Sequence, residues 1–194
     1  MLTVSETKPN QAFPTTDAEW YDSENCPSWL TEYIAFHART KGTEQARYMV
    51  FSCHQHECYF GLGDRLRGIM MFLRAAAASK RVLLIDIASP TDMREFFLPA
   101  LIDWTVGSLA LPKPDFPWKA GDGDDREALF RSNAALLLPA QYLVVQGFGA
   151  LHTTPIVGAP DIDWAGENTH CAQRSLFKPS DGVQQASLSQ GLCV

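Results

Sequence analysis

The alternation of hydrophobic and polar positions is most regular between residues 47 and 87. Residues 47–53 form a short run of aromatic and β-branched side chains, which is typical of a strand. A glycine-bearing turn at 61–64 leads into residues 65–79, where strong helix formers place apolar side chains on one face. Residues 81–87 are a mainly apolar run, as expected for a parallel strand covered on both faces. The segment therefore predicts one βαβ unit.

The pattern on either side of this unit predicts the rest of an α/β fold. Apolar side chains recur at three-to-four spacing after Ser28 and indicate a helix that Gly42 stops. Residues 127–137 have a helical composition, and residues 141–146 have the pattern of a further strand. We predict a Rossmann-like parallel sheet with flanking helices.

Composition along the chain suggests three segments. Residues 1–25 are polar, carry prolines, and are interpreted as a flexible lead-in. Residues 26–185 form the predicted domain. Ser180 or Asp181 is placed to cap a last helix, which has barely begun when residues 186–194 end the chain as a truncated tail.

The bulk composition excludes some classes of protein. The 194 residues are 46% hydrophobic and 20% charged, which allows a packed core. The formal net charge of -6 argues against nucleic-acid binding through bulk positive charge. The sequence shows neither a membrane-spanning apolar run nor a signal peptide at its start. Five cysteines, an odd number, give no clean disulfide framework, so the compartment stays open.

The turn between the first predicted strand and its helix carries the strongest candidate chemistry. Glycines leave backbone amides uncovered, the first amides of a helix have no partner within it, and the helix dipole adds positive charge there. Two arginines in the first turn suit phosphate, although they are unfavourable for the helix itself. The predicted phosphate-binding residues are Gly61, Gly63, Asp64, Arg65 and Arg67.

The two arginines of this turn have an alternative, purely structural interpretation. They could pair with Asp64 or Asp86 and brace the turn. Standard nucleotide loops fit poorly, because position 66 is leucine where a dinucleotide fingerprint needs glycine or alanine. No Gly-Lys-Ser/Thr follows either, which disfavours a nucleoside triphosphatase.

Two neighbouring features supply further candidates. The segment Cys53-His-Gln-His-Glu-Cys58 lacks the separated ligand pairs of usual zinc sites, so we predict no metal. A flexible loop or a Cys53–Cys58 disulfide are the alternatives, and His54 or His56 could face a cleft. Asp86 ends the strongest strand, where ligands gather in open α/β sheets, and could orient a hydroxyl or act as a base. The alternative is that Asp86 caps the next turn or pairs with Arg65.

Residues 58–86 resemble the amino-terminal motif of fucosyltransferase-like proteins. The stretch Gly-Leu-Gly-Asp-Arg-Leu-Arg-Gly-Ile begins at Gly61, and Arg-Val-Leu-Leu-Ile-Asp ends at Asp86. Xyloglucan-type fucosyltransferases carry a similar glycine-bearing helix start and strand, and protein O-fucosyltransferases have a comparable loop. The similarity is specific over 58–86 and fainter over the rest of 26–185.

The resemblance implies the GT-B arrangement of two Rossmann-like domains facing a cleft, of which this chain is the amino-terminal half. It implies GDP-fucose as donor, a glycan or protein hydroxyl as acceptor, and no obligatory metal. The predicted phosphate-binding residues would line the diphosphate side of the cleft. The family acts in the Golgi or secretory lumen.

The family's second half carries a His-x-Arg motif and the main donor-binding residues. Nothing after Ser180 supplies them, so we expect a chain that is incomplete on its own. The alternative is a non-catalytic relative that binds a phosphorylated ligand or is inert.

Overall fold

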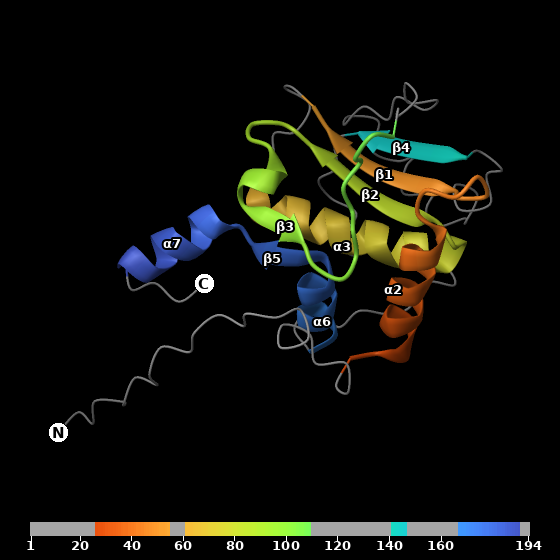
Figure 1. Ribbon diagram of the computed structural model, residues 1–194, viewed down its shortest axis with the longest axis horizontal. Coiled ribbons are helices and arrows are strands. Elements are labelled where there is room, and N and C mark those ends of the chain that lie inside the picture. The colour runs from red at the N-terminus through yellow and green to blue at the C-terminus, as the bar shows by residue number, and fades with distance from the viewer. Residues whose placement is uncertain (1–25, 55–60, 110–140, 147–166, 191–194) are drawn as a thin grey trace.

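The predicted βαβ unit is confirmed by the computed structural model, which describes residues 26–54, 61–109, 141–146 and 167–190 (Figure 1). The unit consists of strand β1 (Tyr48–Cys53), helix α3 (Leu62–Ser79) and strand β2 (Val82–Ile87). β1 and β2 are parallel, and Ser52 pairs with Asp86. The carboxyl ends of both strands therefore meet at one edge of the sheet.

The strand predicted at residues 141–146 is also confirmed. Strand β4 (Tyr142–Gln146) pairs in parallel with β1, and the described sheet has the order β2-β1-β4. β1 therefore lies in the middle, and the chain reaches strands on both of its sides. This three-stranded parallel sheet with flanking helices is an α/β arrangement compatible with a Rossmann-like fold.

Three helices pack against one face of the sheet: α2 (Ser28–Thr40), α3 and α6 (Glu167–Leu176) (Figure 1). Successive strand residues point to opposite faces. The residues of the sheet in the core with these helices are Met49, Phe51, Cys53, Leu83, Ile85, Ile87 and Leu143. Those on the opposite face are Tyr48, Val50, Val82, Leu84 and Val144. Burial on both faces explains the mainly apolar sequence of β2.

Helix α2 is fastened to β2 by polar groups as well as by packing. The Tyr33 hydroxyl donates to the Arg81 carbonyl at 3.0 Å and accepts from the Leu83 amide at 3.0 Å. One helical turn later, the His37 Nε2 donates to the Leu83 carbonyl at 3.1 Å. The helix ends as predicted, because Gly42 takes a φ of 82°, a value that favours glycine.

The chain after β2 forms a smaller unit beside the main sheet. A short 3-10 helix η2 (Met93–Glu95) precedes strand β3 (Phe97–Pro99), which pairs antiparallel with β5 (Phe177–Pro179). Helix α7 (Asp181–Gln190) follows β5 and extends past the predicted domain boundary at residue 185. The predicted lead-in 1–25 and the helix at 127–137 lie outside the described residues.

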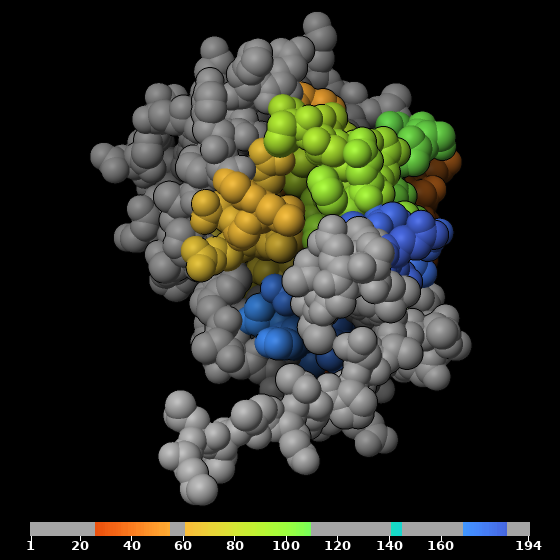
Figure 2. Space-filling model, turned by 90° about the vertical axis from the view of Figure 1, so that its left-hand side faces the viewer, coloured from red at the N-terminus to blue at the C-terminus, as the bar shows by residue number. Residues whose placement is uncertain are grey.

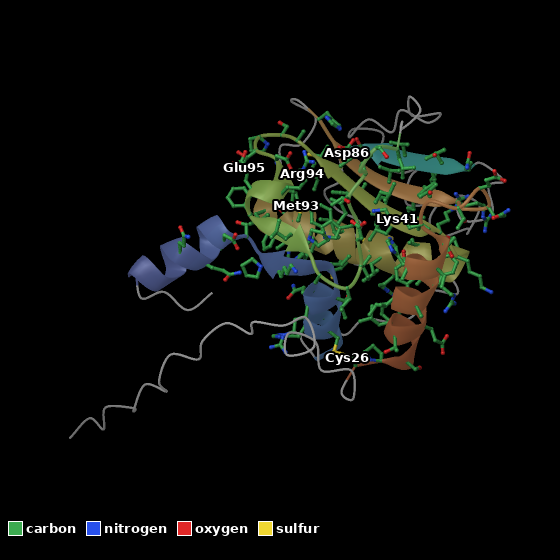
Figure 3. The ribbon with its side chains drawn as sticks, in the orientation of Figure 1. Cys26, Lys41, Asp86, Met93, Arg94 and Glu95 are labelled. Atoms are coloured by element: carbon green, nitrogen blue, oxygen red, sulfur yellow. A yellow bond between two sulfur atoms is a disulfide. The ribbon has the colours of Figure 1, made fainter. Side chains whose placement is uncertain are left out.

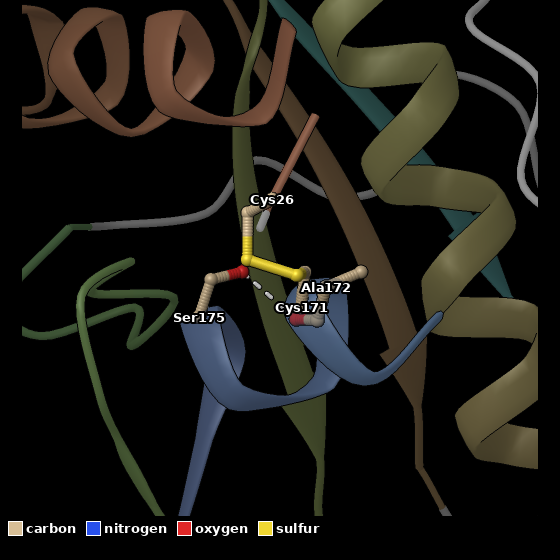
Figure 4. Close-up of a disulfide and its surroundings, with 4 residues drawn as sticks. All are labelled: Cys26, Cys171, Ala172 and Ser175. Atoms are coloured by element: carbon tan, nitrogen blue, oxygen red, sulfur yellow. Dashed lines mark hydrogen bonds between the residues drawn. A yellow bond between two sulfur atoms is a disulfide. The ribbon is translucent and has the colours of Figure 1, made fainter. Parts of the chain in front are cut away.

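A disulfide that the sequence did not predict joins Cys26, just before α2, to Cys171 on α6 (Figure 4). The Cα atoms are 5.6 Å apart, and 145 positions separate the two cysteines in sequence. Cys53 is also disulfide-bonded. The proposed partner Cys58 lies outside the described residues.

The hydrophobic pattern missed helix α6, and it also missed the short strands β3 and β5. The last carbonyls of α6 are bonded by the segment after β3: the Ile102 amide donates to Ser175 at 2.9 Å, and the Trp104 indole donates to Leu176 at 2.7 Å. Together with the disulfide, these bonds fix α6 against the sheet.

Candidate functional site

The carboxyl edge of the parallel sheet is where the predicted site residues gather. Helix α3 connects the carboxyl end of β1 to the amino end of β2, so its first turn lies at this edge. Because β1 is central and its neighbours are reached on opposite sides, its carboxyl end is a topological switch point. In open α/β sheets, ligands bind at such points.

The first turn of α3 is exposed at this edge, beside the segment that follows β2 (Figure 2). The helix begins at Leu62, so Gly63 and Asp64 belong to its first turn rather than to a preceding loop. Gly61 is the N-cap, has an extended backbone, and provides no side-chain cap. The N-cap residue therefore provides no side chain for the first amides of this 18-residue helix, where the helix dipole adds positive charge.

Neither glycine at the start of α3 is required by the fold around it. The φ of Gly61 is -64°, which any residue can adopt. Among the described residues, no atom lies within 4 Å of a Cβ placed on Gly61 or Gly63. The space beside these two backbone positions is therefore open among the described residues, which allows an anion to approach the start of the helix.

The two arginines of this turn have different surroundings. The Arg65 side chain is buried, and its Nη1 donates to the Ser89 carbonyl at 2.7 Å, which braces α3 against the segment after β2. Burial lowers the pKa of Arg65. Arg67 is exposed and lies only 3.7 Å from the Asp64 carboxylate, a loose pair one turn apart. Arg67 can therefore turn toward an anion at little cost, whereas Arg65 cannot.

A histidine–aspartate pair stands at the same edge of the sheet. His54 directly follows β1, and its Nε2 lies 2.6 Å from the Asp86 Oδ2 on β2. The parallel register places Ser52 opposite Asp86, which brings the next residues of β1 within reach of this carboxylate. The side chains of His54 and Asp86 are 45% and 29% exposed, so both are accessible to solvent. Asp86 therefore pairs with His54. The alternative interpretation of the sequence, in which Asp86 pairs with Arg65, is wrong.

A polar hollow of about 230 Å³ is lined by Asp86 and lies between the end of β2, η2 and the segment 104–107. Asp92 accepts from the Arg94 amide at 2.9 Å and pairs with the Arg94 guanidinium. Hydrogen bonds from Arg94 lower the pKa of Asp92. Asp86 and Arg94 lie close together at this hollow (Figure 3).

A larger hollow of about 610 Å³ lies far from these groups, between α2 and the end of α3. Its lining includes Trp29, Phe36, Arg39 and Lys80. Lys80 follows the last turn of α3, so this hollow is at the amino edge of the sheet, away from the switch point.

The structure thus places most of the predicted site residues along one edge. The outward-facing ones are Gly61, Gly63, Asp64 and Arg67, and Asp86 lies nearby with His54. Arg65 shares the edge but is committed to a backbone carbonyl. His56 lies outside the described residues, as does most of the segment 53–58 that was considered for zinc. The described side chains include no group of three or more potential metal ligands.

Comparison of the chain with protein-family models, curated proteins and solved structures gives no match. The fucosyltransferase resemblance therefore rests on the quoted residues alone. No helix in the described part of the chain is long and apolar enough to cross a bilayer.

Proposed function

We propose that this chain is the phosphate-facing, Rossmann-like domain of a glycosyltransferase of the fucosyltransferase type. In this proposal it forms the amino-terminal half of a GT-B arrangement, the donor is GDP-fucose, and the acceptor is a glycan or protein hydroxyl. The observation that carries the proposal is the open start of α3 at the switch point of the sheet.

The physical argument concerns the diphosphate leaving group. Glycosyl transfer breaks the bond between the sugar and the diphosphate, and negative charge grows on the phosphate oxygens. Fixed amides and a guanidinium aimed at this charge stabilise the transition state. The first turn of α3 offers both, because Gly61 and Gly63 expose the amides and Arg67 can leave its loose pair with Asp64.

Arg65 has a positioning role in this proposal. Its bond to Ser89 fixes the first turn of α3 relative to the end of β2 and so keeps the amides at the edge of the sheet. The commitment of one of the two arginines also favours the second candidate function, a non-catalytic domain that binds a phosphorylated ligand. Binding of GDP without any turnover of GDP-fucose would indicate that second function.

Calorimetric titration of GDP tests the proposal with variants that the structure predicts to fold. Gly63→Ala should weaken binding at least fivefold because the new methyl group covers the amides. It should also raise the free energy of unfolding by about 0.4–1 kcal/mol, since the φ and the space at this position accept alanine. Arg67→Ala should weaken binding about 5- to 30-fold through loss of a charged hydrogen bond.

Matched controls separate the site from general effects of the substitutions. Gly182→Ala changes the second residue of α7, the same helix position that Gly63 has in α3. Arg39→Ala removes an exposed arginine of α2, away from the carboxyl edge. Both should bind GDP like the parent. The proposal is wrong if the parent shows no binding at millimolar GDP, or if all four variants bind equally well.

A further inference from the structure

The His54–Asp86 pair stands out among the side chains that the proposed diphosphate site does not use. The imidazole Nε2 lies 2.6 Å from a carboxylate oxygen. A carboxylate can only accept a hydrogen bond at neutral pH, so Nε2 carries the proton of this bond. A neutral imidazole in this tautomer has its lone pair on Nδ1.

The surroundings leave this nitrogen available. His54 has no further hydrogen bond to any residue in the described part of the chain, and its side chain is 45% exposed. Asp86 makes no other hydrogen bond within the described residues either. The core histidine His37 also bonds through its Nε2, but it is only 1% exposed, so solvent and ligands do not reach its ring. His54 differs from it in being open to solvent.

The location places the pair next to the proposed diphosphate site. His54 is the first residue after the central strand, and β1 leads into the start of α3 across residues 55–60. Asp86 is the residue before the last of β2. The pair and the first turn of α3 thus share the carboxyl edge, where one group can hold a leaving diphosphate and another can accept a proton.

We propose that His54 is the proton acceptor for the incoming hydroxyl and that Asp86 orients it, an inference that rests on the proposed function. The acceptor oxygen forms a bond to the sugar C1, and the C1–O bond to the diphosphate breaks with its electron pair leaving on the diphosphate. The hydroxyl proton passes to Nδ1 of His54. The resulting imidazolium is stabilised by the Asp86 carboxylate.

The charged groups around the pair fit this role. Asp86 faces His54 from β2, and Arg94 of η2 lies near enough that the Asp86 charge contributes to its raised pKa, after the larger effect of its bonds to Asp92. Arg94 is itself neutralised by Asp92. The carboxylate of Asp86 is therefore free to stabilise a positive charge on His54.

The test measures GDP release from GDP-fucose in water, with water as the hydroxyl, alongside GDP affinity. His54→Gln keeps a donor for Asp86 but removes the basic nitrogen, and it should lower kcat about 10²- to 10⁴-fold. Asp86→Asn should lower kcat by a smaller factor. Both should bind GDP within twofold of the parent. The acidic limb of the parent's kcat–pH profile should be absent from the residual activity of His54→Gln, a change that a merely structural role would not produce.

His170→Gln makes the same substitution at an exposed histidine of α6 and should leave all values unchanged. A His54→Gln variant that keeps more than a third of the parental kcat overturns the assignment while the proposed function stands. A parent that binds GDP but releases none from GDP-fucose also overturns it. Absence of GDP binding by the parent refutes the proposed function itself and the role of His54 with it.

Discussion

The disulfide between Cys26 and Cys171 is expected to supply a large part of the stability of this fold. The bond joins positions 145 apart in sequence, and closing so long a loop restricts the unfolded chain strongly. The chain-entropy relation gives about 5 kcal/mol at 25 °C for this separation. A domain of ordinary stability has roughly 5–15 kcal/mol in total, so loss of the bond should leave a marginal fold.

The perturbation is the Cys26→Ala/Cys171→Ala double variant, studied without reductant so that the disulfide of Cys53 stays intact. In urea, with a slope of about 2.5 kcal/mol per M, the unfolding midpoint should fall by roughly 2 M. Each single variant already breaks the bond and should lose nearly as much as the double variant. The two single losses should therefore be far from additive.

Two results would contradict this role of the disulfide. A double variant within 1 kcal/mol of the parent would show that the cross-link does not restrict the unfolded state as calculated. Single losses that sum to the double loss would show that each cysteine acts through its own packing; Cys171 is buried, at 7% exposure.

Two further predictions concern side chains that fasten the helices. Trp104→Phe removes the indole that donates to the Leu176 carbonyl at 2.7 Å, and it should lower the free energy of unfolding in urea by about 1–2 kcal/mol. The control is Trp29→Phe, which changes a half-buried tryptophan with no such bond among the described residues and should lower it less. Burial, partly opposed by the bond to Leu83, lowers the pKa of His37, so the unfolded chain takes up a proton on this residue at a higher pH than the folded chain. His37 therefore lowers stability as the pH falls through about 6.5 toward 5; the melting temperature should drop less over this range in His37→Gln, and equal drops would contradict the assignment.

The sequence predicted the βαβ unit well because local pattern and final environment agree there. The mainly apolar β2 is buried on both faces, and Gly42 ends α2 with the positive φ that only glycine adopts easily. Helix α6 escaped prediction because it is short and polar and is held by partners distant in sequence, namely Cys26 and the segment around Trp104.

The candidate site was predictable in position but not in its detailed roles. A glycine-bearing turn after a strand indicated the edge of the sheet correctly. Spacing could not show that Arg65 reaches the Ser89 carbonyl, because that contact depends on where the chain turns after β2. Nor could it choose between two neighbouring histidines, since the pairing of His54 with Asp86 follows from the parallel register of β1 and β2.

The most direct test of the central claim is a titration of the ¹⁵N-labelled chain with GDP, followed by amide chemical shifts. An anion at the start of α3 should move the amide signals of Gly61–Asp64 first and most, together with the side-chain signal of Arg67. These shifts should saturate together, and in Gly63→Ala they should need at least fivefold more GDP to reach the same extent. Signals that stay unmoved at millimolar GDP, or shifts confined to the hollow lined by Trp29 and Lys80, would contradict the account.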